Sequence, residues 1–290
     1  MPHRIIRTFH STCMVSDYDQ TVRVLGHLAG LRVLEYGESE DVGRRGGMTW
    51  IGDNSIEVAE PIIPGHAAAR FLERFGAGMH SCAYQVENLD ATIAHLEAAG
   101  VKVGVRPSPG FCFTDPRTTG GLLFEWADFT IPEDPRAGAP EPLHMVDPVL
   151  DVTTHAFVGA VLPDPIEWAE TFGPLFGLTE VFRHPAATGN QAVVGLAAPD
   201  CVLALFRLPG EMGAQIWGVD HTRPRCHLLG LGVPSLEAAS RSLAKAGVPV
   251  LHRTADSLIL DPGQTGEVPL MVVDRLLPGD PREASSSPDV

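Results

Sequence analysis

Positive charge is scarce in this sequence. Its 290 residues contain 21 Lys and Arg against 36 Asp and Glu, which gives a formal net charge of −15. Sequence-independent binding to nucleic acid relies on clustered Lys and Arg, so we expect no nucleic-acid partner. No stretch reaches the roughly 18 consecutive apolar residues of a membrane-spanning helix. The opening MPHRIIRTFH also lacks the apolar segment that a secretory signal needs. We therefore expect no membrane partner.

Cysteine is also sparse. The chain has five cysteines, an odd number, and no CxxC pair. This pattern fits neither a disulfide framework nor a cysteine zinc site, and it is typical of reduced thiols. Hydrophobic residues make up 44% of the chain and charged residues 20%, as in globular proteins. The sequence predicts an acidic, soluble, cytoplasmic protein.

Two segments have the composition of connecting or terminal chain. TIPEDPRAGAPEPLHMVDP (130–148) is rich in Pro and acidic residues, and the final PGDPREASSSPDV is polar and rich in Pro and Ser. These segments predict a first domain over 1–130, a linker over 131–149, a second domain over 150–276 and a disordered tail over 277–290.

The two predicted domains repeat one pattern. VENLDATIAHLEAAGVKV and VPSLEAASRSLAKAGVPV each place apolar residues at helical spacing, end the helix at a glycine and lead into a strand. DPRTTGGLLFEWAD (115–128) overlays DPGQTGEVPLMVVD (261–274) without a gap. Such a sustained self-match indicates an internal duplication. Each half divides again into units of strand, helix and several strands, at about 5–60, 77–128, 151–208 and 223–274.

Four polar residues interrupt the apolar strands of the first domain: His10 in IIRTFHSTCMV, Glu57 in SIEVAEP, His80 in MHSCAYQV and Glu125 in GLLFEWAD. Strand alternation directs each side chain to one definite face of a sheet. Taken singly, each fits a hydrogen-bonded structural histidine or a solvated glutamate. Taken together, one His and one Glu in each unit predict a shared site. Two buried carboxylates need a cation, most simply a divalent metal.

FLERFGAGMHSCAYQVENLDATIAHLEAAGVKV, followed by FTDPRTTGGLLFEW, resembles the vicinal oxygen chelate superfamily of glyoxalase, bleomycin-resistance and dioxygenase proteins. Within it, the methylmalonyl-CoA epimerase and glyoxalase I branch is the most similar. The resemblance implies an α+β fold in which four βαβββ modules pair into two cupped mixed β-sheets with helices outside. It also implies four metal ligands, in the His, Glu, His, Glu order of bacterial glyoxalase I: His10, Glu57, His80 and Glu125.

The sequence departs from the epimerase pattern at two positions. Ser81 stands where those proteins commonly have a second His beside the ligand, and Thr49 stands where they have an acidic base. A metal-bound carboxylate that leaves the ion could supply the base instead. Glu125 and Glu57 are therefore the predicted catalytic residues.

Four further residues are predicted to contact the substrate. Tyr84 and Cys82 are expected on the face of His80, and Thr49 occupies the position of the missing base. Arg117, in a loop, is a candidate for holding a charged substrate group, although it also fits a solvated turn.

Two imidazoles and two carboxylates, with room for water or substrate, suit an octahedral ion such as Ni, Co, Mn, Mg or Fe(II), and Zn is also compatible. Such an ion would stabilise an enediolate formed from an α-carbonyl or acyl-thioester small molecule. The predicted function is a metal-dependent isomerase or lyase. An Fe(II) extradiol-type dioxygenase and a metal-free small-molecule binding or resistance protein remain alternatives. Four modules in one chain allow either a monomer or a homodimer.

The second domain is predicted to be a degenerate copy. His155 and His227 align with His10 and His80, but the offset places Leu203 opposite Glu57 and Met271 opposite Glu125. Two histidines with a leucine and a methionine make a poor site for a hard ion. His155 and His227 are therefore predicted to be structural.

Overall fold

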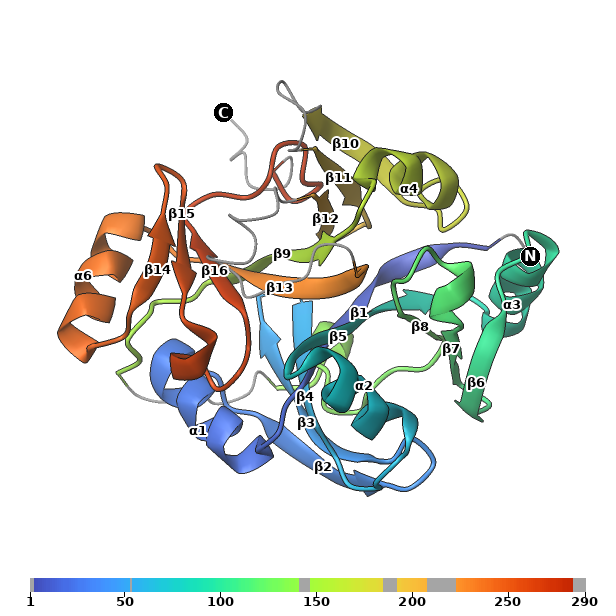
Figure 1. Ribbon diagram of the computed structural model, residues 1–290, viewed down its shortest axis with the longest axis horizontal. Helices are drawn as coiled ribbons and strands as arrows, with labels where there is room; N and C mark the ends of the chain where they lie inside the picture. Colours follow the sequence, from blue (N-terminus) through green and yellow to red (C-terminus); the bar gives the residue numbers. More distant parts are fainter. Residues whose placement is uncertain (1–2, 53, 141–146, 185–191, 208–222, 284–290) are drawn as a thin grey trace.

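The fold consists of two eight-stranded mixed β-sheets with helices packed against them (Figure 1). The computed structural model describes residues 3–52, 54–140, 147–184, 192–207 and 223–283. The strand order is β2-β3-β4-β1-β5-β8-β7-β6 in the first sheet and β10-β11-β12-β9-β13-β16-β15-β14 in the second. The two orders match strand for strand, which confirms the predicted α+β fold of four βαβββ modules.

The first sheet is made of β1 (Ile5–Met14), β2 (Leu34–Ser39), β3 (Arg44–Ile51), β4 (Asn54–Pro61), β5 (Gly78–Val86), β6 (Val103–Ser108), β7 (Phe111–Thr114) and β8 (Phe124–Ala127). The second sheet is made of β9 (Thr154–Val161), β10 (Thr179–His184), β11 (Val193–Ala197), β12 (Val202–Phe206), β13 (Arg225–Gly232), β14 (Val250–Arg253), β15 (Ser257–Leu260) and β16 (Leu270–Val273). The helices are α1 (Tyr18–Ala29), α2 (Ala67–Phe75), α3 (Leu89–Ala98), α4 (Pro165–Phe172) and α6 (Leu236–Ala246).

Local sequence signals set the ends of the helices. The side chain of Asn88 accepts a hydrogen bond from the backbone of the first turn of α3, and Ser235 does the same for α6. Helices α1 and α6 end at Gly30 and Gly247, whose φ angles of 71° and 73° lie in the left-handed region that glycine adopts without strain. These are the capping and glycine-stop patterns that the sequence displays.

One hydrophobic core joins the two halves. Strand β5 packs against β13, so that Cys82 and Tyr84 of the first sheet belong to the same buried cluster as Cys226 and Leu229 of the second. The Trp168 indole N–H of α4 also donates to the backbone carbonyl of Thr119, at 3.0 Å. The described halves therefore share apolar burial as well as polar contacts.

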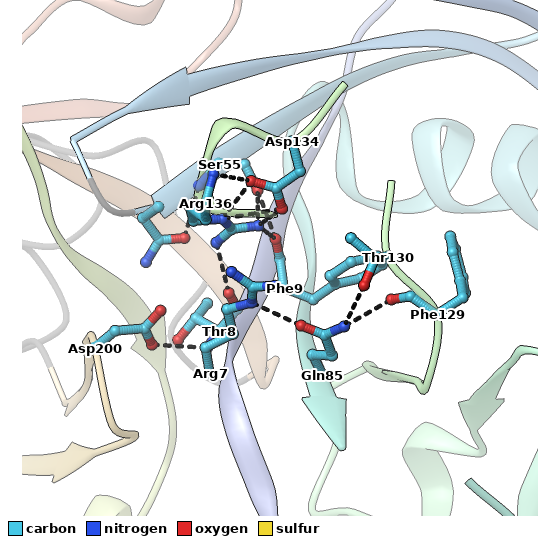
Figure 2. A network of polar contacts seen from close by, with 11 residues as sticks. Arg7, Thr8, Phe9, Ser55, Gln85, Phe129, Thr130, Asp134, Arg136 and Asp200 are labelled. Atoms are coloured by element: carbon cyan, nitrogen blue, oxygen red, sulfur yellow. Dashed lines mark hydrogen bonds and ion pairs between the residues drawn. The ribbon is translucent and has the colours of Figure 1, made fainter. Parts of the chain in front are cut away.

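Part of the predicted linker is folded onto the first sheet. We call residues 129–138 the strap. The Arg136 guanidinium donates to the backbone carbonyls of Thr8 and Phe9 at 2.9 Å each and pairs with the fully buried Asp134 at 2.8 Å (Figure 2). Closer to β8, the Gln85 side-chain amide donates to the carbonyl of Phe129 at 2.8 Å (Figure 2).

The predicted disordered tail is wrong over residues 277–283. Arg282 donates to the backbone carbonyls of His155 and Ala156, at 2.9 and 2.8 Å, and pairs with the buried Asp280. The Arg136 and Arg282 interactions both come from the tripeptide Asp-Pro-Arg, whose composition by itself is typical of a turn. Residues 284–290 of the predicted tail, and 141–146 of the predicted linker, lie outside the described residues.

Arg136→Lys is expected to lower the free energy of unfolding by about 1–3 kcal/mol, because lysine cannot reach two carbonyls and a carboxylate in one plane and leaves a buried acceptor unpaired. Urea unfolding monitored by circular dichroism measures this change. Arg117→Lys is the matched control, because it alters the same tripeptide where the Arg side chain is 87% exposed, and it is expected to leave the unfolding curve unchanged. Equal curves for both variants would contradict a structural role for the strap.

Candidate active site

Two neighbouring hollows lie against the first sheet. The central hollow has a volume of about 720 Å³ and the side hollow about 640 Å³. Arg44 and Val42 line both of them. The central hollow is lined mainly by apolar residues, with the strap as one wall: Phe9, Leu34, Met48, Trp50, Phe111, Phe129, Ile131 and Pro132, together with His10, Tyr36, Glu57 and Glu125.

Strand register brings three of the four predicted ligands together. Thr12 of β1 pairs with Glu57 of β4, and Ala83 of β5 pairs with both His10 of β1 and Glu125 of β8. The His10 ring lies between the two carboxylates, with Nε2 3.5 Å from an oxygen of Glu125 and Nδ1 3.9 Å from an oxygen of Glu57. All three side chains are 3–4% exposed. The site is thus a buried His–Glu–Glu group.

Glu57 has partners on both carboxylate oxygens. Its Oε1 receives hydrogen bonds from Arg44 Nη2, at 2.9 Å, and from the Tyr36 hydroxyl, while the Thr12 hydroxyl donates to Oε2 at 2.8 Å. Burial by itself raises the pKa of Glu57, but Arg44, His10 and these hydrogen bonds outweigh it, so the pKa lies below its usual value. Glu57 is therefore held as a carboxylate by its neighbours.

Sequence reasoning missed Arg44 and Tyr36. Because Met48 of β3 pairs with Glu57, alternation places Arg44 on the same face of the sheet. Tyr36 reaches Glu57 across Gly46, where a Cβ would overlap the Tyr36 hydroxyl. The run GRRGG at the start of an extended segment, an arginine followed by glycines, is the signal that could have indicated a cation beside this carboxylate. Tyr36 gave no such signal, because its position depends on a register shift between β2 and β3.

Several buried polar atoms at the central hollow have no hydrogen-bond partner among the described residues. They are Glu125 Oε2, Arg44 Nε and Trp50 Nε1. A buried polar group left unpaired costs about 1–3 kcal/mol. One acceptor and two donors are thus left unpaired on residues that line the central hollow.

His80 lies apart from the other three predicted ligands. It lines the side hollow, where its ring meets Phe71 of α2 edge to face at 4.7 Å and its Nδ1 lies 3.1 Å from the Ser81 hydroxyl. Burial, followed by the Arg44 charge, lowers the pKa of His80 to about 3. Residues of α2 form a wall of the side hollow.

The structure corrects three of the predicted substrate contacts. The register shift of β5 at His80 puts Cys82 and Tyr84 on the opposite face, where they are 2% and 1% exposed in the main core. Thr49 also faces away from the hollow, because its neighbour Met48 is the residue paired with Glu57. Arg117 lies at the rim of the side hollow and is paired with Asp115 in an exposed turn.

The predicted set of metal ligands does not fit a divalent ion. Within the described parts of the chain, no three His, Cys, Asp or Glu side chains are placed to hold one ion. The Arg44 guanidinium already supplies the positive charge that buried Glu57 needs. His80, the second nitrogen donor, faces the other hollow. We derive no step of the chemistry through a metal.

The second sheet carries no comparable group in its described residues, and two of its predicted correspondences shift. His227 lies at a register shift of β13, as His80 does in β5. Met271 pairs with Gly230, as Glu125 pairs with Ala83. Counting from that shift, Phe157 and Ala204 correspond to His10 and Glu57, so the alignments of His155 and Leu203 with those residues were wrong. The reason is the offset between the halves, which is 147 residues in both strands, two more than from His10 to His155 and one more than from Glu57 to Leu203. The resulting hollow, about 440 Å³, has an apolar lining that includes Phe157, Ala204, Phe206, Leu228 and Met271.

A family model of the Glyoxalase/Bleomycin resistance protein/Dioxygenase superfamily matches residues 9–113. Over these residues the chain is similar to members of that superfamily. The match spans β1 to β7 and so includes His10, Glu57 and His80. No curated protein matches the chain, and none of its described helices is long and apolar enough to cross a membrane.

A solved structure has a similar fold over nearly the whole chain. A triple variant of 4-hydroxymandelate synthase from Streptomyces coelicolor is 16% identical, with 96% of each chain covered and a TM-score of 0.69. Methylmalonyl-CoA epimerase from Mycobacterium tuberculosis is 22% identical over 47% of this chain and 93% of the epimerase, with a TM-score of 0.41. These structural neighbours are enzymes that act on small molecules. At this level of identity the likeness establishes the fold alone.

Proposed function

We propose that the central hollow is the active site of an isomerase or lyase that moves a proton at the carbon next to a carbonyl group of a small molecule. The observation that supports this most directly is the buried His10–Glu125 pair, 3.5 Å apart, in which Glu125 keeps one oxygen without a hydrogen-bond partner among the described residues. A carboxylate with a free oxygen beside an imidazole is suited to proton transfer.

The different surroundings of the two predicted catalytic residues support different roles for them. Glu57 is engaged by Arg44, Tyr36 and Thr12, so taking a proton would break an ion pair and hydrogen bonds. Among the described residues, Glu125 forms an ion pair with His10 alone, and Arg44 and Tyr36 act on it only through their charge. We therefore assign Glu125 as the base and Glu57 as the group that positions Arg44.

The proposed step is a proton abstraction that leaves an enolate. After a small rotation of its carboxyl group, Glu125 takes the proton from the substrate carbon, and the electron pair of the broken C–H bond forms the carbon–carbon double bond of the enolate. The Arg44 Nε–H and the Trp50 indole N–H, neither of which has a partner among the described residues, donate to the enolate oxygen. Return of the proton to another position gives an isomerase, whereas loss of a leaving group gives a lyase.

The metal-stabilised enediolate predicted from the sequence is not part of this proposal, because the predicted ligands do not gather around one point. An extradiol-type dioxygenase needs two histidines and a carboxylate on one iron, and His10 and His80 line different hollows. A metal-free binding protein is the second candidate. The aromatic lining of the central hollow by Phe9, Phe111 and Phe129 favours it.

Deuterium exchange separates the two candidates. The protein is incubated in D₂O with 2-oxo acids, thiohemiacetals and branched acyl thioesters, and loss of the proton next to the carbonyl is followed by NMR. We expect exchange on at least one class, and we expect Glu125→Gln to slow it by about 10²–10⁴-fold while ligand binding is retained. Glu133→Gln, at the exposed rim of the same hollow, is the control and should exchange at the normal rate.

Each outcome of this experiment decides one point. Binding without exchange in the unmodified protein would overturn the enzyme proposal in favour of the binding protein. Exchange that is unaffected by Glu125→Gln would show that another group is the base.

A further inference from the structure

The two modules of the first sheet are related by an internal two-fold symmetry. This symmetry tests whether His80 occupies the position of the second metal-ligating histidine. Strands β1 and β5 run antiparallel at its centre, and each pairs in parallel with a strand that carries a glutamate. Glu57 pairs with Thr12, and Glu125 pairs with Ala83. Exchanging the two modules therefore maps Glu57 onto Glu125 and Thr12 onto Ala83.

The same exchange of the two modules identifies the residue that is equivalent to His10. Across β1 and β5, His10 pairs with Ala83 and Thr12 pairs with Ser81. Because the exchange maps Thr12 onto Ala83, it maps His10 onto Ser81. His80 is the unpaired residue at the register shift next to Ser81, so the position that corresponds to the first imidazole holds a hydroxyl.

Arg44 lies where its charge reaches three of the four predicted ligands. It contacts Glu57 at 2.9 Å and lines both hollows. Its charge acts on the carboxylates of Glu57 and Glu125 and on the imidazole of His80. With 6% exposure, it is a buried cation beside two glutamates that occupy symmetry-related positions.

We infer that the first sheet is a converted metal site, in which Arg44 supplies the positive charge and Ser81 stands in the place of the second imidazole. The protein as it exists does not hold a divalent ion at this position. The inference concerns the resident cation and holds whether the hollow catalyses proton transfer or only binds a ligand.

The first test is metal uptake by the unmodified protein. The protein is exposed in turn to Co(II), Ni(II), Zn(II), Mn(II) and Fe(II), freed of excess ion by gel filtration and analysed for metal by plasma mass spectrometry. We expect no stoichiometric ion, and we expect His80→Ala to give the same result. Uptake of one ion per chain that is lost in His10→Ala or His80→Ala would overturn the inference.

The second test restores the metal site. The double variant Arg44→Leu with Ser81→His removes the guanidinium and supplies the second imidazole in symmetric register. We expect it to bind one Co(II) per chain, with visible d–d absorption and a raised thermal midpoint in the presence of the ion. The matched control is Ser81→His alone, which keeps Arg44 and should bind no ion.

Because loss of Arg44 leaves Glu57 without its cation, the double variant is refolded both with and without Co(II). A folded double variant that takes up no ion would contradict the symmetry argument, and uptake by Ser81→His alone would contradict the role given to Arg44. If the double variant does not fold under either condition, uptake by the unmodified protein decides the inference.

Discussion

Arg44→Leu is expected to lower the free energy of unfolding by about 3–5 kcal/mol at pH 7, because it strips a buried carboxylate of its partner. Glu57 is 3% exposed and keeps only the Tyr36 and Thr12 hydroxyls as donors once the guanidinium is gone. Chemical denaturation monitored by tryptophan fluorescence and circular dichroism measures the change. The loss should appear as a lower midpoint with an unchanged m-value.

Two further variants show whether the effect belongs to the ion pair. Arg45→Leu alters the next residue of β3, whose partially exposed side chain pairs with Asp19 and Glu60, and it should cost less than about 1 kcal/mol. Glu57→Gln added to Arg44→Leu should recover part of the lost stability, since no uncompensated charge then remains. A double variant no more stable than Arg44→Leu alone would show that Arg44 acts through packing and not through charge.

Acidification from pH 6.5 to pH 4.5 is expected to destabilise the protein through its buried histidines. Burial, followed by the Arg282 charge, lowers the pKa of His155 to about 3, while the unfolded chain titrates near 6.5. The unfolded state therefore binds the proton first. The stability that neutral His155 contributes is complete above pH 6.5 and is lost as the pH falls toward 3, at about 1.4 kcal/mol per pH unit.

His155→Leu isolates this contribution. The variant should lose about 2 kcal/mol less than the unmodified protein between pH 6.5 and pH 4.5, and it should be at least as stable at pH 7.5. Denaturation curves across that range measure the slopes. Burial also lowers the pKa values of His80 and His227. The free energy of unfolding of the variant should therefore still fall with decreasing pH, but less steeply. Parallel slopes for variant and unmodified protein would show that His155 titrates normally.

The fold could be predicted from the sequence because its signals are local and repeated. Helix α3 follows from apolar spacing and a glycine just beyond its end, and α6 repeats these two signals in the second half. A βαβββ unit that recurs leaves few ways to pair its strands, so the two equivalent sheets follow from the duplication.

The sequence also indicated that His10, Glu57 and Glu125 belong together, because strand alternation and the repeat place them at equivalent points. Only the tertiary structure decided which cation neutralises the two carboxylates. A register shift in β5 turns His80 toward the side hollow and Cys82 and Tyr84 into the core. A one-residue shift inverts the facing of side chains, and no local signal in MHSCAYQV marks it.

The electrostatic role of Arg44 could not be predicted from the sequence either. The sequence establishes that two buried carboxylates require a cation, and it contains an arginine on a neighbouring strand. Whether a metal or a guanidinium meets the requirement depends on the pairing of Met48 with Glu57 and on the space left by Gly46. The sequence determined the fold and the need for positive charge, and the packing of β3 against β4 determined that Arg44 meets it.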